Sequence, residues 1–146
     1  MNLPGPLRHV ACGRFELSLD RPLIMGVVNV TPDSFSDGGR HGTIEAAIAH
    51  ATRLLAEGAD LLDIGGESTR PGAAPVVPDE EIARVAPVVS ALRDCGVPLS
   101  VDTRHPQTMR AVLELGADMI NDVGAMRAPG AIDAIRDSGC GVCLMH

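Results

Sequence analysis

The chain has 146 residues, of which 45% are hydrophobic and 21% charged, and these values fit one domain with an apolar core. Its net charge of −7 argues against nonspecific nucleic-acid binding, and an anionic small molecule would need a metal ion or local arginines. No stretch is long and apolar enough for a membrane span, and the N-terminus lacks a signal-peptide core, so we expect a cytoplasmic protein.

Residues 1–22 predict a short N-terminal hairpin that covers one end of a sheet. Residues 23–146 repeat one unit, which consists of an apolar strand, a polar or glycine-rich loop, an amphipathic helix and a glycine. The predicted strands cover residues 23–30, 59–66, 97–102, 117–124 and 141–146. The predicted helices cover residues 43–58, with Thr43 as the N-cap, and 79–94, 106–115 and 131–137.

This alternation indicates a parallel sheet with right-handed crossovers, either an open doubly wound sheet or part of a (β/α)8 barrel. The glycine-rich fingerprint that an open nucleotide-binding sheet would show is missing. Polar residues instead end successive strands, which favours the barrel, because barrel enzymes place their chemistry at that rim. These residues are Asn29, Asp63 and Glu67, Asp102, Asn121 and Asp122, and His146.

The first long loop covers residues 29–42, and its glycines predict mobility. Phe35 is one of two aromatic residues in the chain, and in this loop it suits a lid over a flat ring. The alternative is a phenylalanine that packs on the rim without a ligand. Asp33 and Asp37 in the same loop could bind an anion through a metal ion or an arginine.

The second long loop covers residues 65–78 and carries the sequence Ser68, Thr69, Arg70 and Pro71. The arginine fork suits a carboxylate or phosphate, although it could also form a surface salt bridge with an aspartate of the first loop. The hydroxyls and the proline face add polar and flat apolar contacts. Two such loops on neighbouring barrel units could close over one ligand.

Four acids and one amide at or just after the strand ends have different predicted roles. Asp102 ends an apolar strand, so its carboxylate needs partners or a ligand, and an amino-substituted heterocycle would fit it. Asn121 can donate and accept hydrogen bonds to such a ring. Asp122 should cap a loop, and Asp63 and Glu67 are expected to serve the loop backbone. Cys140 and Cys143 form a C-x-x-C in a strand, which we interpret as two small core residues.

Together these segments resemble the dihydropteroate synthase family. The matching stretches are MGVVNVTPDSFSDGG, GADLLDIGGESTRPGA, PLSVDT, GADMINDVGA and CLMH. The resemblance implies a (β/α)8 barrel that joins 6-hydroxymethyl-7,8-dihydropterin pyrophosphate to para-aminobenzoate, releases pyrophosphate and is inhibited by sulfonamides. It also implies a homodimer for the full-length enzyme.

Residue roles follow from the same resemblance. Asn29 matches the ligand of a Mg²⁺ that holds the pyrophosphate, and Asp102 and Asn121 match pterin-ring contacts. Met145 would line the pterin pocket, and Thr69 matches a substrate contact. The aminobenzoate ring would lie near Phe35, Pro71, Ser68 and Arg70. The catalytic candidates are Asp33, Phe35, Arg70 and Asp102.

A complete barrel of this kind needs roughly 250 residues. The later motifs of the family are missing, so we expect only the N-terminal hairpin, five strands and four helices of the barrel. We also expect this fragment to be inactive. The alternatives are a noncatalytic half-barrel that binds a pterin and a pterin-dependent methyltransferase.

Overall fold

A computed structural model describes residues 8–32 and 39–146. Two antiparallel strands, β1 (His9–Cys12) and β2 (Phe15–Ser18), form the predicted hairpin. A parallel sheet of order β3-β4-β5-β6-β7 follows. Its strands are β3 (Met25–Asn29), β4 (Leu61–Gly65), β5 (Leu99–Asp102), β6 (Met119–Asp122) and β7 (Gly141–Leu144). The helices are α1 (Gly39–Ala56), α2 (Pro78–Leu92), α3 (Pro106–Glu114) and α4 (Ala131–Ile135).

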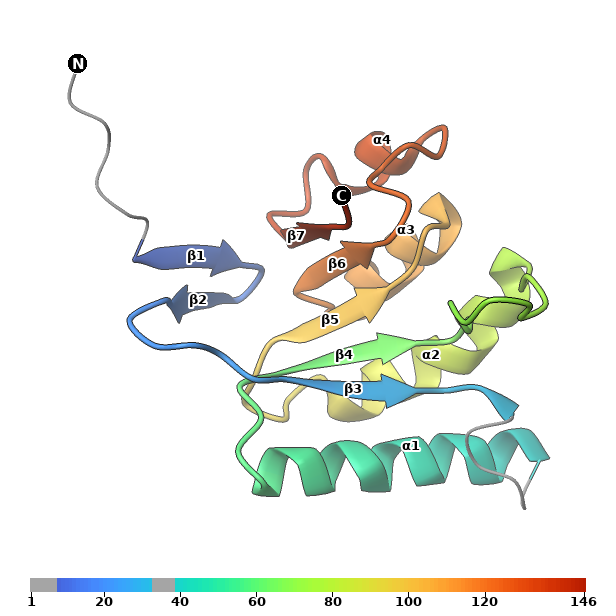
Figure 1. The fold of residues 1–146 in the computed structure, drawn as a ribbon, viewed down its shortest axis with the longest axis horizontal. Coiled ribbons are helices and arrows are strands. Elements are labelled where there is room, and N and C mark those ends of the chain that lie inside the picture. Colours follow the sequence, from blue (N-terminus) through green and yellow to red (C-terminus); the bar gives the residue numbers. More distant parts are fainter. Residues whose placement is uncertain (1–7, 33–38) are drawn as a thin grey trace.

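The helices lie on one side of the parallel sheet, and the apolar core fills the layer between them (Figure 1). Four neighbouring strands each contribute one residue that points toward the helices. These residues pair in register and are fully buried: Val28, Ile64, Val101 and Ile120. Burying each such side chain stabilises the fold by about 1.5–3 kcal/mol relative to exposure. Because side chains alternate along a strand, the residues between them face away from the helices.

The hairpin lies beside the amino ends of the strands, opposite the loops that follow them (Figure 1). Its Cys12 is buried against Leu61 and Met119, which begin β4 and β6. Arg14 donates two hydrogen bonds of 3.0 Å to the Asp118 carboxylate, through Nε and Nη2. Gly13 has φ +56°, and a Cβ there would lie 2.7 Å from the Asp118 Cα. A glycine is therefore required for this close approach, and the hairpin covers one end of the sheet as predicted.

The start of α1 differs from the prediction. The helix already includes Gly39, so Thr43 is a buried residue inside it and the predicted N-cap is wrong. Gly42 is likewise helical, and the predicted glycine-rich loop does not extend to it. A glycine inside a helix costs about 1 kcal/mol relative to alanine. The burial of Ala47 and Ala51, later in the same helix, outweighs this cost. Within the described ranges, no helix has both the length and the apolarity needed to cross a membrane.

Candidate functional site

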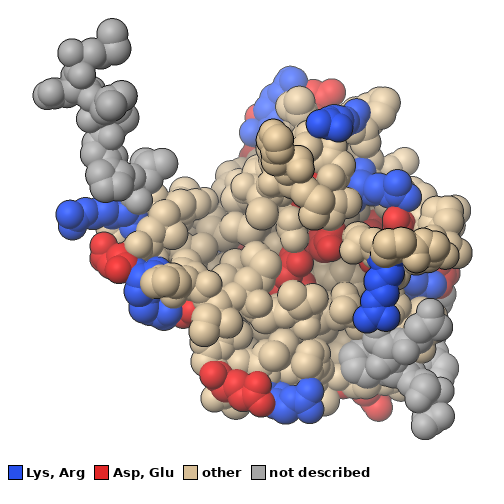
Figure 2. Space-filling model, viewed as in Figure 1, with Lys and Arg blue, Asp and Glu red and all other residues tan. Residues whose placement is uncertain are grey.

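The predicted strand-end residues form one row on the face away from the helices. Asn29 pairs in register with Gly65, Gly65 with Asp102, and Asp102 with Asn121. Residues paired in this way point to the same face, so three polar side chains share it, with a glycine between two of them. Acidic atoms are exposed near the middle of this side of the molecule (Figure 2).

Gly65 keeps the space between Asn29 and Asp102 open. A Cβ on Gly65 would lie 3.9 Å from Asn29 Oδ1 and 3.9 Å from Asp102 Oδ2. Both distances are ordinary van der Waals contacts, so a methyl group would fill the gap rather than clash. The two oxygens therefore flank a small open space at the carboxyl ends of β3 and β5.

Asp102 is the acid of this row, and its pKa lies well above the ordinary value. Burial, and then the negative charges of Asp63, Glu81, Asp122 and Glu67, raise its pKa to about 6. It accepts no hydrogen bond from any residue in ranges 8–32 and 39–146. Its oxygens can therefore accept hydrogen bonds from a ligand, as predicted for a carboxylate that faces an amino-substituted ring.

Asp63 lies beside this row and is buried. Its Oδ1 accepts a 2.7 Å hydrogen bond from Ser100 Oγ, and its Oδ2 accepts a 3.1 Å hydrogen bond from Asn121 Nδ2. The expectation that Asp63 serves the loop backbone is wrong, because its position in the middle of β4 directs it toward β5 and β6. The sequence analysis makes no prediction for Ser100. It lies two positions before Asp102 in β5, so both side chains point to the same face of the sheet.

A cavity of about 720 Å³ opens beside the row, within the size range of small-molecule sites. Asn29 and Asp102 line it from the strands. The loop that follows β4 contributes Ser68, Thr69, Arg70 and Pro71, and α2 contributes Glu80 and Arg84. The structure thus brings together two strand-end residues and the four loop residues predicted from sequence.

Glu67 fixes the loop after β4. Its carboxylate accepts a 3.2 Å hydrogen bond from the backbone N–H of Val76, and it pairs with Arg104 at 3.0 Å and His105 at 3.2 Å. The prediction that Glu67 serves the loop is confirmed. Arg84 Nη1 also donates to the Gly66 carbonyl at 2.8 Å, a contact with no local sequence signal, since a helical arginine usually faces solvent.

A second buried acid lies behind the loop. Glu81 accepts hydrogen bonds from Thr103 Oγ1 at 2.8 Å and Thr108 Oγ1 at 2.6 Å, and burial raises its pKa. It joins α2 to the segment after β5 and to α3. The sequence does not reveal this role, because an acid in the first turn of a helix usually interacts with the helix dipole.

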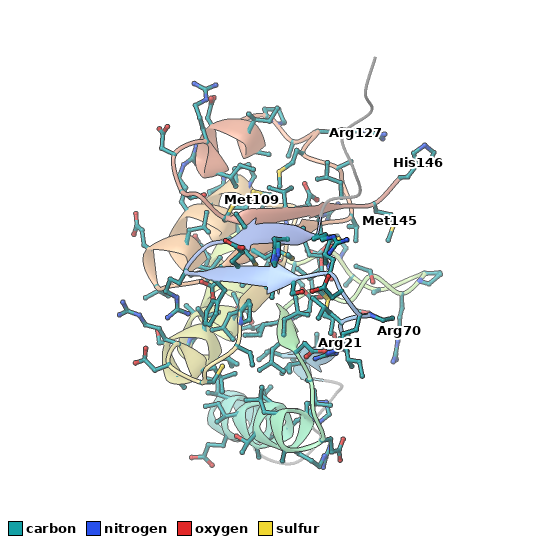
Figure 3. All side chains as sticks on the ribbon, turned by 90° about the vertical axis from the view of Figure 1, so that its left-hand side faces the viewer. Arg21, Arg70, Met109, Arg127, Met145 and His146 are labelled. Atoms are coloured by element: carbon teal, nitrogen blue, oxygen red, sulfur yellow. The ribbon has the colours of Figure 1, made fainter. Side chains whose placement is uncertain are left out.

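The other predicted residues have separate locations. Met145 follows β7 and is 59% exposed; with Arg70 it projects on the side of the sheet away from the helices (Figure 3). Arg70 forms no ion pair with a described residue. Asp33 and Phe35 lie outside the described residues. Asp122 accepts hydrogen bonds from the backbone of Gly124 and Met126, so the predicted loop cap is confirmed.

The two residues of the C-x-x-C face opposite sides of the sheet, as the strand period predicts. Cys140 packs against the core beneath the helices. Cys143 is exposed and stands in register with Asn121, so the interpretation of both as core residues is wrong for Cys143. No group of three or more His, Cys, Asp or Glu among residues 8–32 and 39–146 could hold a metal ion.

Parallel strand order, helices on one side of the sheet and polar strand ends beside a cavity are features of a segment of a (β/α)8 barrel. Residues 25–146 match the family model of the pterin binding enzymes, and the chain belongs to this family. Its curated relatives include dihydropteroate synthases. The chain is 55% identical to that of Neisseria meningitidis serogroup B over 95% of this chain and 50% of the relative. It is 49% identical to that of Escherichia coli K12 over 90% of this chain and 47% of the relative.

Solved structures of dihydropteroate synthases are similar to this chain in both fold and sequence. Xanthomonas albilineans dihydropteroate synthase with 4-aminobenzoic acid has a TM-score of 0.90 and 59% identity over 95% of this chain and 51% of that one. The Burkholderia cenocepacia enzyme complexed with 7,8-dihydropteroate has a TM-score of 0.84 and 56% identity over 94% of this chain and 46% of that one. The chain spans about half the length of these relatives. The predicted fold class is confirmed: the chain forms the hairpin, five strands and four helices of a (β/α)8 barrel.

Proposed function

We propose that this chain forms the N-terminal part of a dihydropteroate synthase. The reaction would join 6-hydroxymethyl-7,8-dihydropterin pyrophosphate to para-aminobenzoate and release pyrophosphate, a step of folate biosynthesis. The observation that carries the proposal is the row of Asn29, Asp102 and Asn121 across adjacent strand ends, beside the cavity. The identity to dihydropteroate synthases over nearly the whole chain supports it.

Asp102 and Asn121 would bind the edge of the pterin ring. A carboxylate accepts hydrogen bonds from ring N–H and amino groups, and an amide offers one acceptor and two donors. Asp102 has a pKa of about 6, so it is ionised above that pH. Its charge can then offset positive charge that develops on the pterin as pyrophosphate departs. Met145, exposed beyond β7, would contribute an apolar contact to the ring.

Asn29 would be a ligand of Mg²⁺. Its amide oxygen faces the open space above Gly65, and Mg²⁺ is commonly held by one or two protein oxygens together with phosphate oxygens and water. One amide oxygen beside an open space fits a metal ion that substrate phosphate oxygens would also hold. When bound, the ion would offset negative charge on the leaving pyrophosphate.

The loop after β4 would hold the aminobenzoate and the leaving group. Arg70 offers a guanidinium without a described ion-pair partner, Ser68 and Thr69 offer hydroxyls, and Pro71 offers a flat face. Phe35 and Asp33 lie outside the described residues; by resemblance to the family, Phe35 would contact the aminobenzoate ring and Asp33 would be a catalytic residue. Sulfonamides would compete for the same place; the Yersinia pestis dihydropteroate synthase, 50% identical, has been solved with a sulfonamide drug.

Equilibrium binding tests this proposal. The chain should bind 6-hydroxymethyl-7,8-dihydropterin in calorimetry, and Asp102→Asn should weaken binding about tenfold or more, because a charge-assisted hydrogen bond is replaced. The exposed Asp20→Asn, in the segment after β2, is the matched control and should bind as the unmodified chain does. Absence of binding, or equal affinities of the two variants, would contradict the proposal.

Turnover is a separate expectation. With both substrates and Mg²⁺, this chain alone should show no ordinary turnover, because it spans about half the length of its relatives. Pterin binding without turnover is the result expected of a half-barrel that needs further strands. Ordinary turnover would show that the described half suffices.

A further inference from the structure

Asp63 is a buried carboxylate that pairs with no positively charged side chain among the described residues. It is 5% exposed, it forms no ion pair with a described residue, and it does not line the cavity. Burying a carboxylate is costly unless hydrogen bonds compensate. Its hydrogen bonds come from Ser100 and from Asn121, and the second of these partners lies in the row of strand-end residues.

The hydrogen bond to Asn121 restricts how that amide can face a ligand. An asparagine amide has two orientations of nearly the same shape, which exchange the positions of its oxygen and its NH2 group. A carboxylate accepts hydrogen bonds and donates none when ionised. Asp63 Oδ2 therefore pairs with Asn121 Nδ2, at 3.1 Å, and the orientation that turns the amide oxygen toward Asp63 is disfavoured.

We propose that Asp63 is a positioning residue that acts through Asn121 and sets the pattern of hydrogen-bond donors and acceptors presented to a heterocyclic ligand. Held in this way, Asn121 keeps its oxygen and its second N–H available, beside the Asp102 carboxylate on the next strand. Ser100 fixes the other oxygen of Asp63 at 2.7 Å, so the carboxylate cannot turn freely. The inference rests on the proposed function for its ligand, a pterin.

The consequence is selectivity between rings of equal shape. In 6-hydroxymethylpterin the ring carries an amino donor at C2 and an acceptor at N1. In 6-hydroxymethyllumazine the same edge carries an oxo acceptor at C2 and an N–H donor at N1. A site with a fixed amide orientation distinguishes these edges, whereas a site with a freely turning amide adapts to either.

The test compares the ratio of the two dissociation constants in the full 146-residue chain. Asp63→Asn has the same shape, but its amide can present either an oxygen or an NH2 group to Asn121, so both orientations become available. The preference for the pterin over the lumazine should fall about tenfold. Asp63→Ser, whose hydroxyl can donate or accept, should have the same effect and serves as the second variant if Asp63→Asn does not fold.

Two controls isolate the route through Asn121. Asp20→Asn makes the same chemical change at an exposed position in the segment after β2, so the ratio should stay unchanged. In an Asn121→Ala background, Asp63→Asn should no longer alter the ratio. Equal weakening of both ligands by Asp63→Asn, with an unchanged ratio, would mean a purely structural role and would overturn the proposal.

A ligand-free measurement separates this inference from the proposed function. In NMR spectra of the chain, one Nδ2 proton of Asn121 should resonate downfield because it is bonded to a carboxylate, and Asp63→Asn should move it upfield. An unaffected proton would overturn the positioning role even if pterins bind. Failure of the chain to bind either ring, with the expected proton shift, would contradict the proposed function alone.

Discussion

The carboxylate of Asp102 has an unfavourable electrostatic environment at neutral pH. Burial raises its pKa most, the negative charges of Asp63, Glu81, Asp122 and Glu67 raise it further, and no described residue donates a hydrogen bond to its carboxylate. Its ionised form is therefore less stable in the folded chain than in water. A ligand that donates N–H groups would relieve this cost, which links a local instability to the proposed binding role.

The stability of the chain should consequently depend on pH through Asp102. Its folded pKa of about 6 exceeds the value near 3.9 of an unfolded chain, so between these values the folded state holds more protons and its stability falls as pH rises. Asp102→Asn should raise the free energy of unfolding by about 2 kcal/mol at pH 8 and change it little at pH 4. Urea unfolding at both pH values measures this, and a gain of equal size at pH 4 would contradict it.

Sequence reasoning predicted the members of the site better than their partners. Asn29, Asp102 and Asn121 are predictable because each ends an apolar strand, and the ends of parallel strands share a rim. The roles of Asp63 and Glu81 depend on Ser100 and Thr108, which lie 37 and 27 positions away in the chain. A local pattern contains no information about such pairs, so the acids were assigned to nearer backbone or to no role.

At the scale of elements, a buried acid links the hairpin to the sheet. Asp118 is fully buried and accepts hydrogen bonds from the Arg14 side chain, the Arg14 backbone and the Leu99 backbone. The strand and helix periods predicted most elements, because alternation and amphipathicity are local. The start of α1 was not predictable in this way, since packing against the sheet extends the helix past residues that resemble a cap and a loop.

Removal of the Arg14 side chain should loosen the hairpin. Arg14→Ala leaves the buried Asp118 carboxylate with its backbone donors only, and we expect a loss of about 2–3 kcal/mol in the free energy of unfolding. Arg21→Ala removes a comparable bidentate contact, to Asp60, at an exposed position and should cost much less. Chemical denaturation of the two variants compares them; equal losses would mean that burial of the acid does not matter.

At the scale of the whole molecule, burial is uneven across the sheet. Val101 in the central strand β5 and Val142 in the outer strand β7 face the same side, since both align with Ile120 of β6. Val101 is fully buried beneath the helices, whereas Val142 is 44% exposed. The sequence predicts that both lie in apolar strands, but an apolar run does not reveal how much of it neighbouring helices cover.

The same substitution at these two positions should therefore have different costs. Val101→Ala removes two methyl groups from a packed core and should lower the free energy of unfolding by about 2 kcal/mol, from lost burial and the cavity left behind. Val142→Ala removes the same atoms from a partly hydrated surface and should cost less than about 1 kcal/mol. Urea unfolding of both variants gives the comparison. A cost at Val142 equal to that at Val101 would mean that another surface covers β7 in solution, and concentration-dependent sedimentation of the unmodified chain would then identify a second copy as that surface.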